Sequence, residues 1–272
     1  MKNYLMLLIL SCIIAILAYG IGSSRRILNG EHAKMGEIPF AVLIDDSNFN
    51  DHKRCGGVII TIVAVLTTAN CIKSLNPNEL TVRAGSTYRD GGIVRKVEMP
   101  IVHENFSETT LDNNIAVLIL NKKFEFSNTI DKLQLPNMKM DLKTHDSATI
   151  YGWGVDEYSD YPDSLKKGDT IVIDSTSCNH QNQVRLPLTP RMFCASSLGE
   201  HFSTACFGDA GGALVKYQYV YGLSYGKSAK SGKSGECTSD TVYTRITALH
   251  EWIIEKLAQH GRQVERRLRG SP

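Results

Sequence analysis

A glycine-rich turn contains the residues best suited to chemistry. Residues 205–215 read ACFGDAGGALV and include the run Gly-Asp-Ala-Gly-Gly. In such a turn the backbone N–H groups of Gly208 and Ala210 can form an oxyanion hole that binds a carbonyl or a carboxylate. The side chain of Ala210 is a methyl group, which can neither attack a carbonyl nor release a proton. The turn therefore has groups for binding an oxyanion but no nucleophile. Alternatively, its glycines are present only because the fold requires their torsion angles.

The elements that must position this turn are mostly short β-strands. Strand-like runs recur between turn residues, at 40–44, 57–68, 80–85, 114–120, 147–154, 169–174 and 217–226. Many short strands with few helical stretches predict an antiparallel sandwich or barrel. One helix is indicated at 247–261, where apolar residues share one face and Gly261 is a natural stop. Its apolar stripe predicts core packing.

The N-terminal residues have the features of a secretory signal peptide. Lys2 precedes an apolar run at 4–20, and Ala18 and Gly20 occupy the small-residue positions of a cleavage site. An apolar run of this length is marginal for a membrane span, so an uncleaved anchor is the alternative. We expect residues 1–20 to be removed. The mature protein is then secreted and extracellular, without a stable membrane anchor.

The cysteine count agrees with an oxidising compartment. Cys12 is lost with the signal peptide, and six cysteines remain: Cys55, Cys71, Cys178, Cys194, Cys206 and Cys237. An even number predicts three disulfides, although six cysteines allow fifteen pairings. There is no C-x-x-C pair and no histidine at ligand spacing from a cysteine, so we expect no metal and no other cofactor.

The charge distribution excludes a nucleic-acid binder. The formal net charge is +2, and arginines are concentrated in the C-terminal tail at 262–272. The domain at 27–261 is slightly acidic, so nothing in this balance indicates a nucleic-acid binder. The tail is either disordered or binds an anionic surface or partner.

Seven motifs in order resemble those of the trypsin/chymotrypsin-like serine proteases. They are RILNG (26–30), CGGVI (55–59), LTTANC (66–71), DNNIAVL (112–118), YGWG (151–154), CFGDAGGALV (206–215) and VYTRI (242–246). The resemblance implies an all-β fold of two packed six-stranded antiparallel β-barrels with a C-terminal α-helix, in a domain at 27–261. It places the site between the barrels. It also implies the disulfide pairings Cys55–Cys71, Cys178–Cys194 and Cys206–Cys237.

The three catalytic positions of that family are all substituted. Asn70 stands where the family has its histidine, Asn114 where it has its aspartate, and Ala210 where it has its serine. An asparagine amide cannot act as a general base, and it carries no charge to stabilise an imidazolium. His103 matches a surface position of the family that is not catalytic. Ser203 and Thr204 have hydroxyl groups, but neither has a base positioned by the sequence.

The positions of the primary specificity pocket have changed as well. Thr204 stands at the base, where a trypsin has aspartate, and Thr241 replaces a glycine that normally leaves room for a substrate side chain. Tyr225 and Gly226 still match the strand that pairs with a substrate backbone. The lysine-containing loop at 227–236 is either an altered recognition loop over a blocked pocket or a solvated insertion.

An activation junction is preserved in the sequence. Arg26 precedes Ile27, so a trypsin-like protease can cut between them and release a short propeptide at 21–26. The resemblance implies that the new N-terminus then inserts and pairs with Asp209, which makes the chain zymogen-like. Alternatively, the junction is a relic without present use.

A further sequence feature is a glycosylation signal. Asn105 begins the sequon NFS and is the glycosylation candidate if it is exposed.

These observations predict a secreted, disulfide-bonded serine protease homologue that is not an enzyme. It would act by binding, as a cofactor, decoy or regulator of proteolysis, and its partner would be a protease, an inhibitor or a protease substrate. The alternatives are a serine-type endopeptidase with an unrecognised nucleophile and an inert component of a secreted fluid.

Overall fold

The structure, a computed structural model, describes most of the predicted domain. The described residues are 30–46, 55–73, 75–154, 163–178, 187–197, 203–225 and 240–269, with side chains as far as residue 263. Several expectations lie outside these residues: the signal peptide at 1–20, the propeptide at 21–26, the Arg26–Ile27 bond, Gly226, the loop at 227–236 and Cys237.

The first barrel is a closed antiparallel sheet in the order β2-β3-β4-β7-β6-β5. Its strands are β2 (Ala41–Asp46), β3 (Cys55–Thr61), β4 (Ala64–Thr67), β5 (Leu80–Ala84), β6 (Ile93–Val102) and β7 (Ala116–Leu120). The short helix α2 (Ala69–Ile72) follows β4, and a 3₁₀ turn, η1 (Pro77–Glu79), precedes β5. In strand β5, buried and part-exposed residues alternate, so one face of the strand points into the barrel.

The second barrel closes through the pairing of β8 with β9, in the order β8-β9-β10-β13-β12-β11, and β1 adds to the edge of β9. Its elements are β1 (Glu31–His32), β8 (Ser147–Gly152), β9 (Lys166–Ile173), β10 (Met192–Ser196), β11 (Ala213–Lys216), β12 (Tyr219–Ser224) and β13 (Asp240–Arg245). The prediction of two six-stranded antiparallel barrels with a C-terminal helix is therefore confirmed.

Four apolar clusters of buried residues lie in the described part of the chain, and three of them are extensive. One fills the first barrel and contains Ile44 and Leu118, and another fills the second and contains Ile150 and Phe193. The third lies between the barrels and includes residues of both barrels and of the C-terminal helix, such as Ile253. Burial of these side chains supplies the main favourable free energy of the fold.

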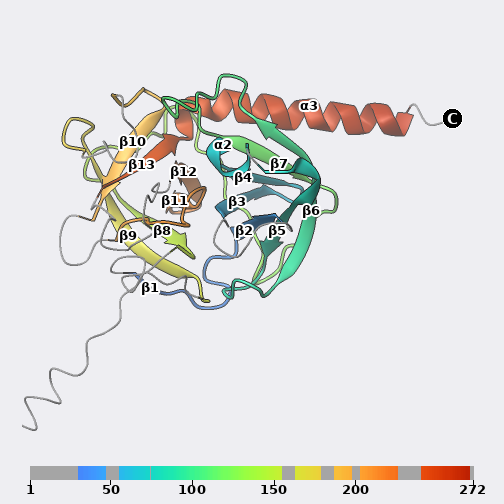
Figure 1. Cartoon of the computed structure of the whole chain (residues 1–272), viewed down its shortest axis with the longest axis horizontal. Helices are drawn as coiled ribbons and strands as arrows, with labels where there is room; N and C mark the ends of the chain where they lie inside the picture. The colour runs from blue at the N-terminus through green and yellow to red at the C-terminus, as the bar shows by residue number, and fades with distance from the viewer. Residues whose placement is uncertain are drawn as a thin grey trace, which may run out of the picture.

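The C-terminal helix differs from its prediction. After a 3₁₀ turn, η3 (Thr247–Leu249), helix α3 (His250–Arg269) continues through Gly261 and runs out past the first barrel (Figure 1). The expected stop at Gly261 is wrong, and the tail is helical as far as Arg269. No other atom comes near the missing side chain of Gly261, so the glycine costs only about 1 kcal/mol of helix propensity there.

The run at 57–68 also differs from its prediction as a single β-rich segment. It folds as a hairpin, in which β3 and β4 pair with Val58 opposite Leu66. The turn lies at Ile62 and Val63, where the Val63 N–H donates to Thr61 Oγ1 at 3.2 Å. Within the described part of the chain, no helix is long and apolar enough to cross a membrane.

Candidate functional site

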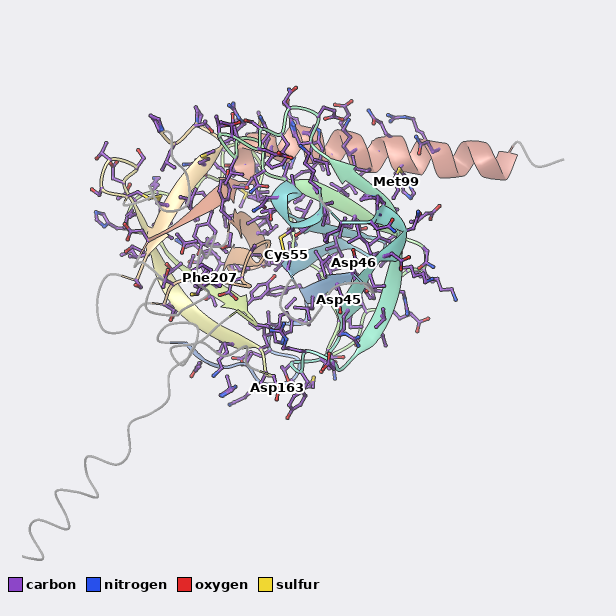
Figure 2. The ribbon with its side chains drawn as sticks, viewed as in Figure 1. Asp45, Asp46, Cys55, Met99, Asp163 and Phe207 are labelled. Atoms are coloured by element: carbon purple, nitrogen blue, oxygen red, sulfur yellow. A yellow bond between two sulfur atoms is a disulfide. The ribbon has the colours of Figure 1, made fainter. Side chains whose placement is uncertain are left out.

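Helix α2 and a disulfide position Asn70. Thr67 ends β4, and Asn70 is the second residue of the four-residue helix that follows. The next residue, Cys71, forms a disulfide with Cys55 of β3, with the Cα atoms 6.1 Å apart. Figure 2 shows Cys55 between the two barrels. The short helix is therefore fixed covalently to the first barrel, at the junction with the second.

Asn70 and Asn114 meet although 44 residues separate them. The Asn70 N–H donates to Asn114 Oδ1 at 2.9 Å, and the Asn70 side-chain amide donates to the Tyr225 carbonyl at 3.4 Å. Asn114 is fully buried, and its carbonyl accepts a bond from Thr244 Oγ1 at 2.7 Å. Its Nδ2 has no hydrogen-bond partner in the described residues. Asn114 thus fixes the backbone of Asn70 but leaves one buried polar group unsatisfied.

The turn at 206–212 packs tightly against the first barrel. The Gly56 N–H donates to the Ala210 carbonyl at 2.7 Å, and the Gly211 N–H donates to the Ser224 carbonyl at 2.8 Å. Gly211 has φ +79, and a Cβ there would lie 2.3 Å from both Gly56 O and Thr67 Oγ1. Glycine is therefore required at this position on grounds of packing and torsion alone.

The two expected oxyanion donors lie at the same turn. Gly208 has φ +90, and Ala210 is partly buried against the apolar cluster that contains Cys55 and Cys71. Among the described residues, no acceptor takes a hydrogen bond from the N–H of Gly208 or Ala210. Both N–H groups can therefore donate a hydrogen bond to a new partner, such as a carbonyl oxygen.

Asp209 is buried behind this turn. Its Oδ1 accepts from the Gly154 N–H and its Oδ2 from the Cys206 N–H, each at 2.8 Å. A Cβ on Gly152 would lie 1.9 Å from Asp209 Oδ1, so this carboxylate occupies space that only glycine leaves open. Because Ile27 lies outside the described residues, its pairing with Asp209 stays a prediction.

The base of the expected specificity pocket is closed by two hydroxyl groups. Thr204 Oγ1 and Thr241 Oγ1 lie 2.9 Å apart, and the two residues are 2% and 1% exposed. Thr241 also donates to the Ala205 carbonyl at 3.4 Å. A substrate side chain that reached this depth would have to break the pair and would find no carboxylate from either residue.

Tyr225 anchors the strand beside this pocket. Its N–H donates to the Val242 carbonyl at 3.0 Å, and its Oη donates to the Leu111 carbonyl at 2.8 Å. Burial raises the pKa of Tyr225, so the phenol stays protonated and acts as a donor. Tyr225 thereby links the second barrel to a loop of the first.

A hollow beside Asn70 was not predicted from the sequence. It has a volume of about 280 Å³ and is lined by Asn70, Lys73, Phe106, Glu108 and Leu111. Lys73 and Glu108 form an ion pair at 2.5 Å, and Lys73 lies over the ring of Phe106 at 5.5 Å. The lining comes from two segments far apart in sequence, which no local pattern could join.

Three histidines of the described residues form side-chain contacts outside this site. His32 contacts Lys166, and His250 contacts the Pro136 carbonyl. His103 accepts a bond from the Asn105 N–H and stacks on Trp252, with ring centroids 4.7 Å apart. The expectation that His103 lies at the surface is wrong: the residue is 9% exposed, and burial lowers its pKa.

The remaining site residues are placed as follows. Cys178 and Cys194 form a disulfide, and Cys206 is disulfide-bonded. Asn105 is exposed at the loop that leads to the hollow. Among the described residues, no group of three or more His, Cys, Asp or Glu side chains could hold a metal ion.

Comparisons with known proteins relate this geometry to a protease family. The family described as "Trypsin" matches residues 27–253. The chain is 30% identical over 236 residues to the vitellin-degrading protease of Bombyx mori, covering 85% of this chain and 86% of that protein. It is 31% identical over 234 residues to trypsin Blo t 3 of Blomia tropicalis, covering 84% of each. It is also 30% identical over 241 residues to transmembrane protease serine 11C of Mus musculus, covering 85% of this chain but 54% of that protein.

Proposed function

The chain belongs to the trypsin family of serine proteases, and from this premise we propose that it acts by binding rather than by hydrolysis. The observation that carries the proposal is Ala210, whose methyl group occupies the nucleophile position of the family motif. Asn70 and Asn114 support it, because neither amide can accept and return a proton at neutral pH. The protein is then a pseudoenzyme that serves as a cofactor, decoy or regulator of proteolysis.

The cleft retains features that suit binding. The Asn70–Asn114 hydrogen bond keeps the family's two positions together, and the N–H groups of Gly208 and Ala210 are available to a carbonyl oxygen. The hollow beside Asn70 adds an apolar surface from Phe106. These features support a polypeptide ligand, so the partner we propose is a protease, an inhibitor or a protease substrate.

Secretion and activation are part of the same proposal. A cut after Arg26 would free the Ile27 amine, and the buried carboxylate of Asp209 would be its partner. The exposed Asn105 would carry an N-linked glycan once the chain entered the secretory pathway. Expression in secreting eukaryotic cells tests entry into the secretory pathway and glycosylation at Asn105, because peptide N-glycosidase should reduce the mass of the wild type but not of Asn105→Gln.

Covalent labelling by a fluorophosphonate tests the loss of catalysis, because the reagent reacts only with an activated nucleophile. The secreted wild type should not be labelled after cleavage at Arg26–Ile27. The variant Asn70→His/Asn114→Asp/Ala210→Ser is the matched control and should be labelled. Labelling of the wild type would contradict the proposal and favour a hydrolase with an unrecognised nucleophile.

Capture of a partner from the source's own secretions separates a binding role from an inert one. Leu111→Arg places a long charged side chain at the hollow and should abolish capture. Met138→Arg makes the same kind of change at a side chain that is 58% exposed elsewhere on the surface, and it should leave capture unchanged. Equal capture by both variants would show that the cleft is not the binding site.

A further inference from the structure

Helix α3 packs on the barrels with one face and leaves another uncovered. On the packed face, Ile253 is buried in the cluster between the barrels, and Lys256 forms an ion pair with Glu104. On the opposite face the exposed residues follow the spacing i, i+3, i+4, i+7, i+10 and i+11, which keeps them on one side of a helix. We call this set the outer face of α3; it consists of Glu251, Ile254, Glu255, Ala258, Gly261 and Arg262.

The charge of the outer face changes sign along the helix. Glu251 and Glu255 lie in the first half of α3, and Arg262 lies in the second half, where Arg266 continues the same face. These four positions are separated by 4, 7 and 4 residues. At 3.6 residues per turn they fall within about 60° of one another around the helix axis. Acid near the start and base near the end also suit the helix dipole, but the dipole does not require them to share one face.

These charges are not neutralised within the described part of the molecule. Glu251, Glu255 and Arg262 form no ion pair with any described residue there. Glu255 accepts a hydrogen bond from Gln259 Nε2 at 2.6 Å, which leaves its charge in place because the amide is neutral. The acidic and basic halves of the outer face are therefore open to partners of opposite charge.

The outer face is complementary to itself when it is reversed. If two copies of α3 lie antiparallel, with a two-fold axis between Ala258 and Gln259, then Glu255 of each copy stands opposite Arg262 of the other. In the same register Glu251 stands opposite Arg266. A two-fold interface forms every contact twice, so both ends of the helix pair join an acidic half to a basic half. A parallel pair would instead place like charges opposite each other.

The middle of the outer face allows two helices to approach closely. Ala258 has a small side chain, and no heavy atom lies within 4 Å of the place where a Cβ on Gly261 would be, apart from the backbone of the helix itself. Ile254 is 46% exposed. In the antiparallel register it lies over Gly261 of the second copy, so the pairing buries an apolar side chain as well as joining opposite charges.

The rest of the fold leaves room for such a pair. Figure 1 shows the barrels on one side of α3, and the C-terminal part of the helix extending beyond them. Because the outer face is directed away from the barrels, the barrels of two paired copies lie on opposite sides of the helix pair. The full length of α3, about 30 Å for twenty residues, is then available for contact.

We propose that the outer face of α3 is an interface with a second copy of this chain, in an antiparallel two-fold pair. Opposite charges meet along the whole face, and this complementarity sets the register. An anionic membrane would attract Arg262 but repel Glu251 and Glu255 on the same face. Ion pairs exposed to water contribute little each, so the dimer is weak and depends on salt. The proposal does not depend on whether the cleft binds or cuts a polypeptide.

Two charge-reversed variants of the full secreted chain test the proposal. The all-basic variant is Glu251→Arg/Glu255→Arg, and the all-acidic variant is Arg262→Glu/Arg266→Glu. Each variant has one sign of charge along the outer face, so it should repel a copy of itself. Mixed in equal amounts, the two variants place opposite charges at every pair of facing positions. Sedimentation velocity at low and high salt measures the association of the wild type, of each variant and of the mixture.

Matched controls make the same charge changes away from α3. Glu98→Arg/Glu125→Arg corresponds to the all-basic variant, and Lys132→Glu/Lys139→Glu corresponds to the all-acidic one; all four residues are exposed. These controls separate an effect of the outer face from an effect of net charge. Circular dichroism checks that every variant is folded.

The wild type should dimerise at low salt and dissociate as salt is added. Each charge-reversed variant alone should associate at least about tenfold more weakly, the controls should stay within about twofold of the wild type, and the mixture should recover the dimer. A wild type that stays monomeric at low salt would overturn the proposal, and so would a folded mixture that fails to associate. Equal losses in the controls would do the same. Tight binding of a monomeric wild type to phosphatidylcholine–phosphatidylserine vesicles would assign the outer face to a membrane instead.

Discussion

The revertant Asn70→His/Asn114→Asp/Ala210→Ser should remain inactive on substrates cut after arginine or lysine. Restoring the family's triad could recover a factor of about 10⁶ in kcat, because its members act as a unit. That gain requires a substrate held within bonding reach, and a misplacement of about 1 Å can cost a factor of about 10². The specificity pocket therefore decides how much of the gain is observed.

The size of the expected loss in kcat/KM on arginine substrates follows from the Thr204–Thr241 pair. Because the two hydroxyls are 2.9 Å apart and buried, no cation can lie between them without breaking the pair. The lost hydrogen bond costs about 1 kcal/mol, and an uncompensated buried cation costs about 3–5 kcal/mol. At 1.36 kcal/mol per tenfold change, the sum corresponds to a loss of about 10³–10⁴ in kcat/KM on arginine substrates.

The assay compares two revertants in a common activation format. An enteropeptidase site in place of residues 22–26 frees Ile27 without adding a trypsin, and fluorophosphonate labelling counts the active sites. The triple revertant should show at most weak cleavage of peptide amides after small residues. Adding Thr204→Asp and Thr241→Gly should increase kcat/KM on arginine amides by at least about 10².

One result would refute this reasoning. If the triple revertant cut efficiently after arginine, the threonine pair would not block the pocket. The protein would then be a trypsin silenced only at its triad, and its cleft would still recognise basic side chains.

Three further predictions concern packing and ionic contacts. Gly211→Ala should destabilise the fold by about 2–5 kcal/mol in urea unfolding, because a left-handed torsion and contact with a backbone carbonyl combine; a change below about 1 kcal/mol would contradict the tight packing of this turn. Hydrogen bonds from Lys256 and Trp252 lower the pKa of Glu104 from 4.5 to about 2. The stabilisation of α3 by ionised Glu104 should therefore be fully present above pH 4.5 and be lost as the pH falls towards 2, which tryptophan fluorescence can follow. The variant Glu104→Gln should remove this pH dependence. Burial opposes ionisation of Asp112, but hydrogen bonds from Arg191 and Thr189 outweigh it and lower its pKa. Asp112→Asn should cost about 1.5–3 kcal/mol, measured as a lower urea midpoint at constant m, and an unchanged midpoint would show that this contact between the barrels contributes nothing.

The sequence was informative where function depends on residue type at a motif position. A methyl group at position 210 has no nucleophilic atom in any fold, so the expectation of lost catalysis needed no coordinates. The many short apolar runs predicted an antiparallel sandwich or barrel, because each run has the length of a strand. The two packed barrels were implied by the resemblance of the ordered motifs to the trypsin/chymotrypsin-like family. The start of the C-terminal helix followed from its apolar periodicity in the same way.

Local patterns failed where distant residues decide the outcome. The run at 57–68 contains no glycine, proline, asparagine or aspartate at its centre, yet it reverses at Ile62, because β3 and β4 must both pair within one closed barrel. Gly261 did not end α3, because one glycine costs less than its helix-forming neighbours contribute. His103 became buried because α3 brings Trp252 onto its ring.

Only the tertiary structure assembled the site. The contact between Asn70 and Asn114 and the hydroxyl pair of Thr204 and Thr241 join residues that are 44 and 37 positions apart. Sequence motifs indicate which residues share a site, but they carry no information on which atoms touch. Each pair lies within one barrel, so these distances are set by how the strands and loops of that barrel pack, and this packing depends on all its buried side chains at once.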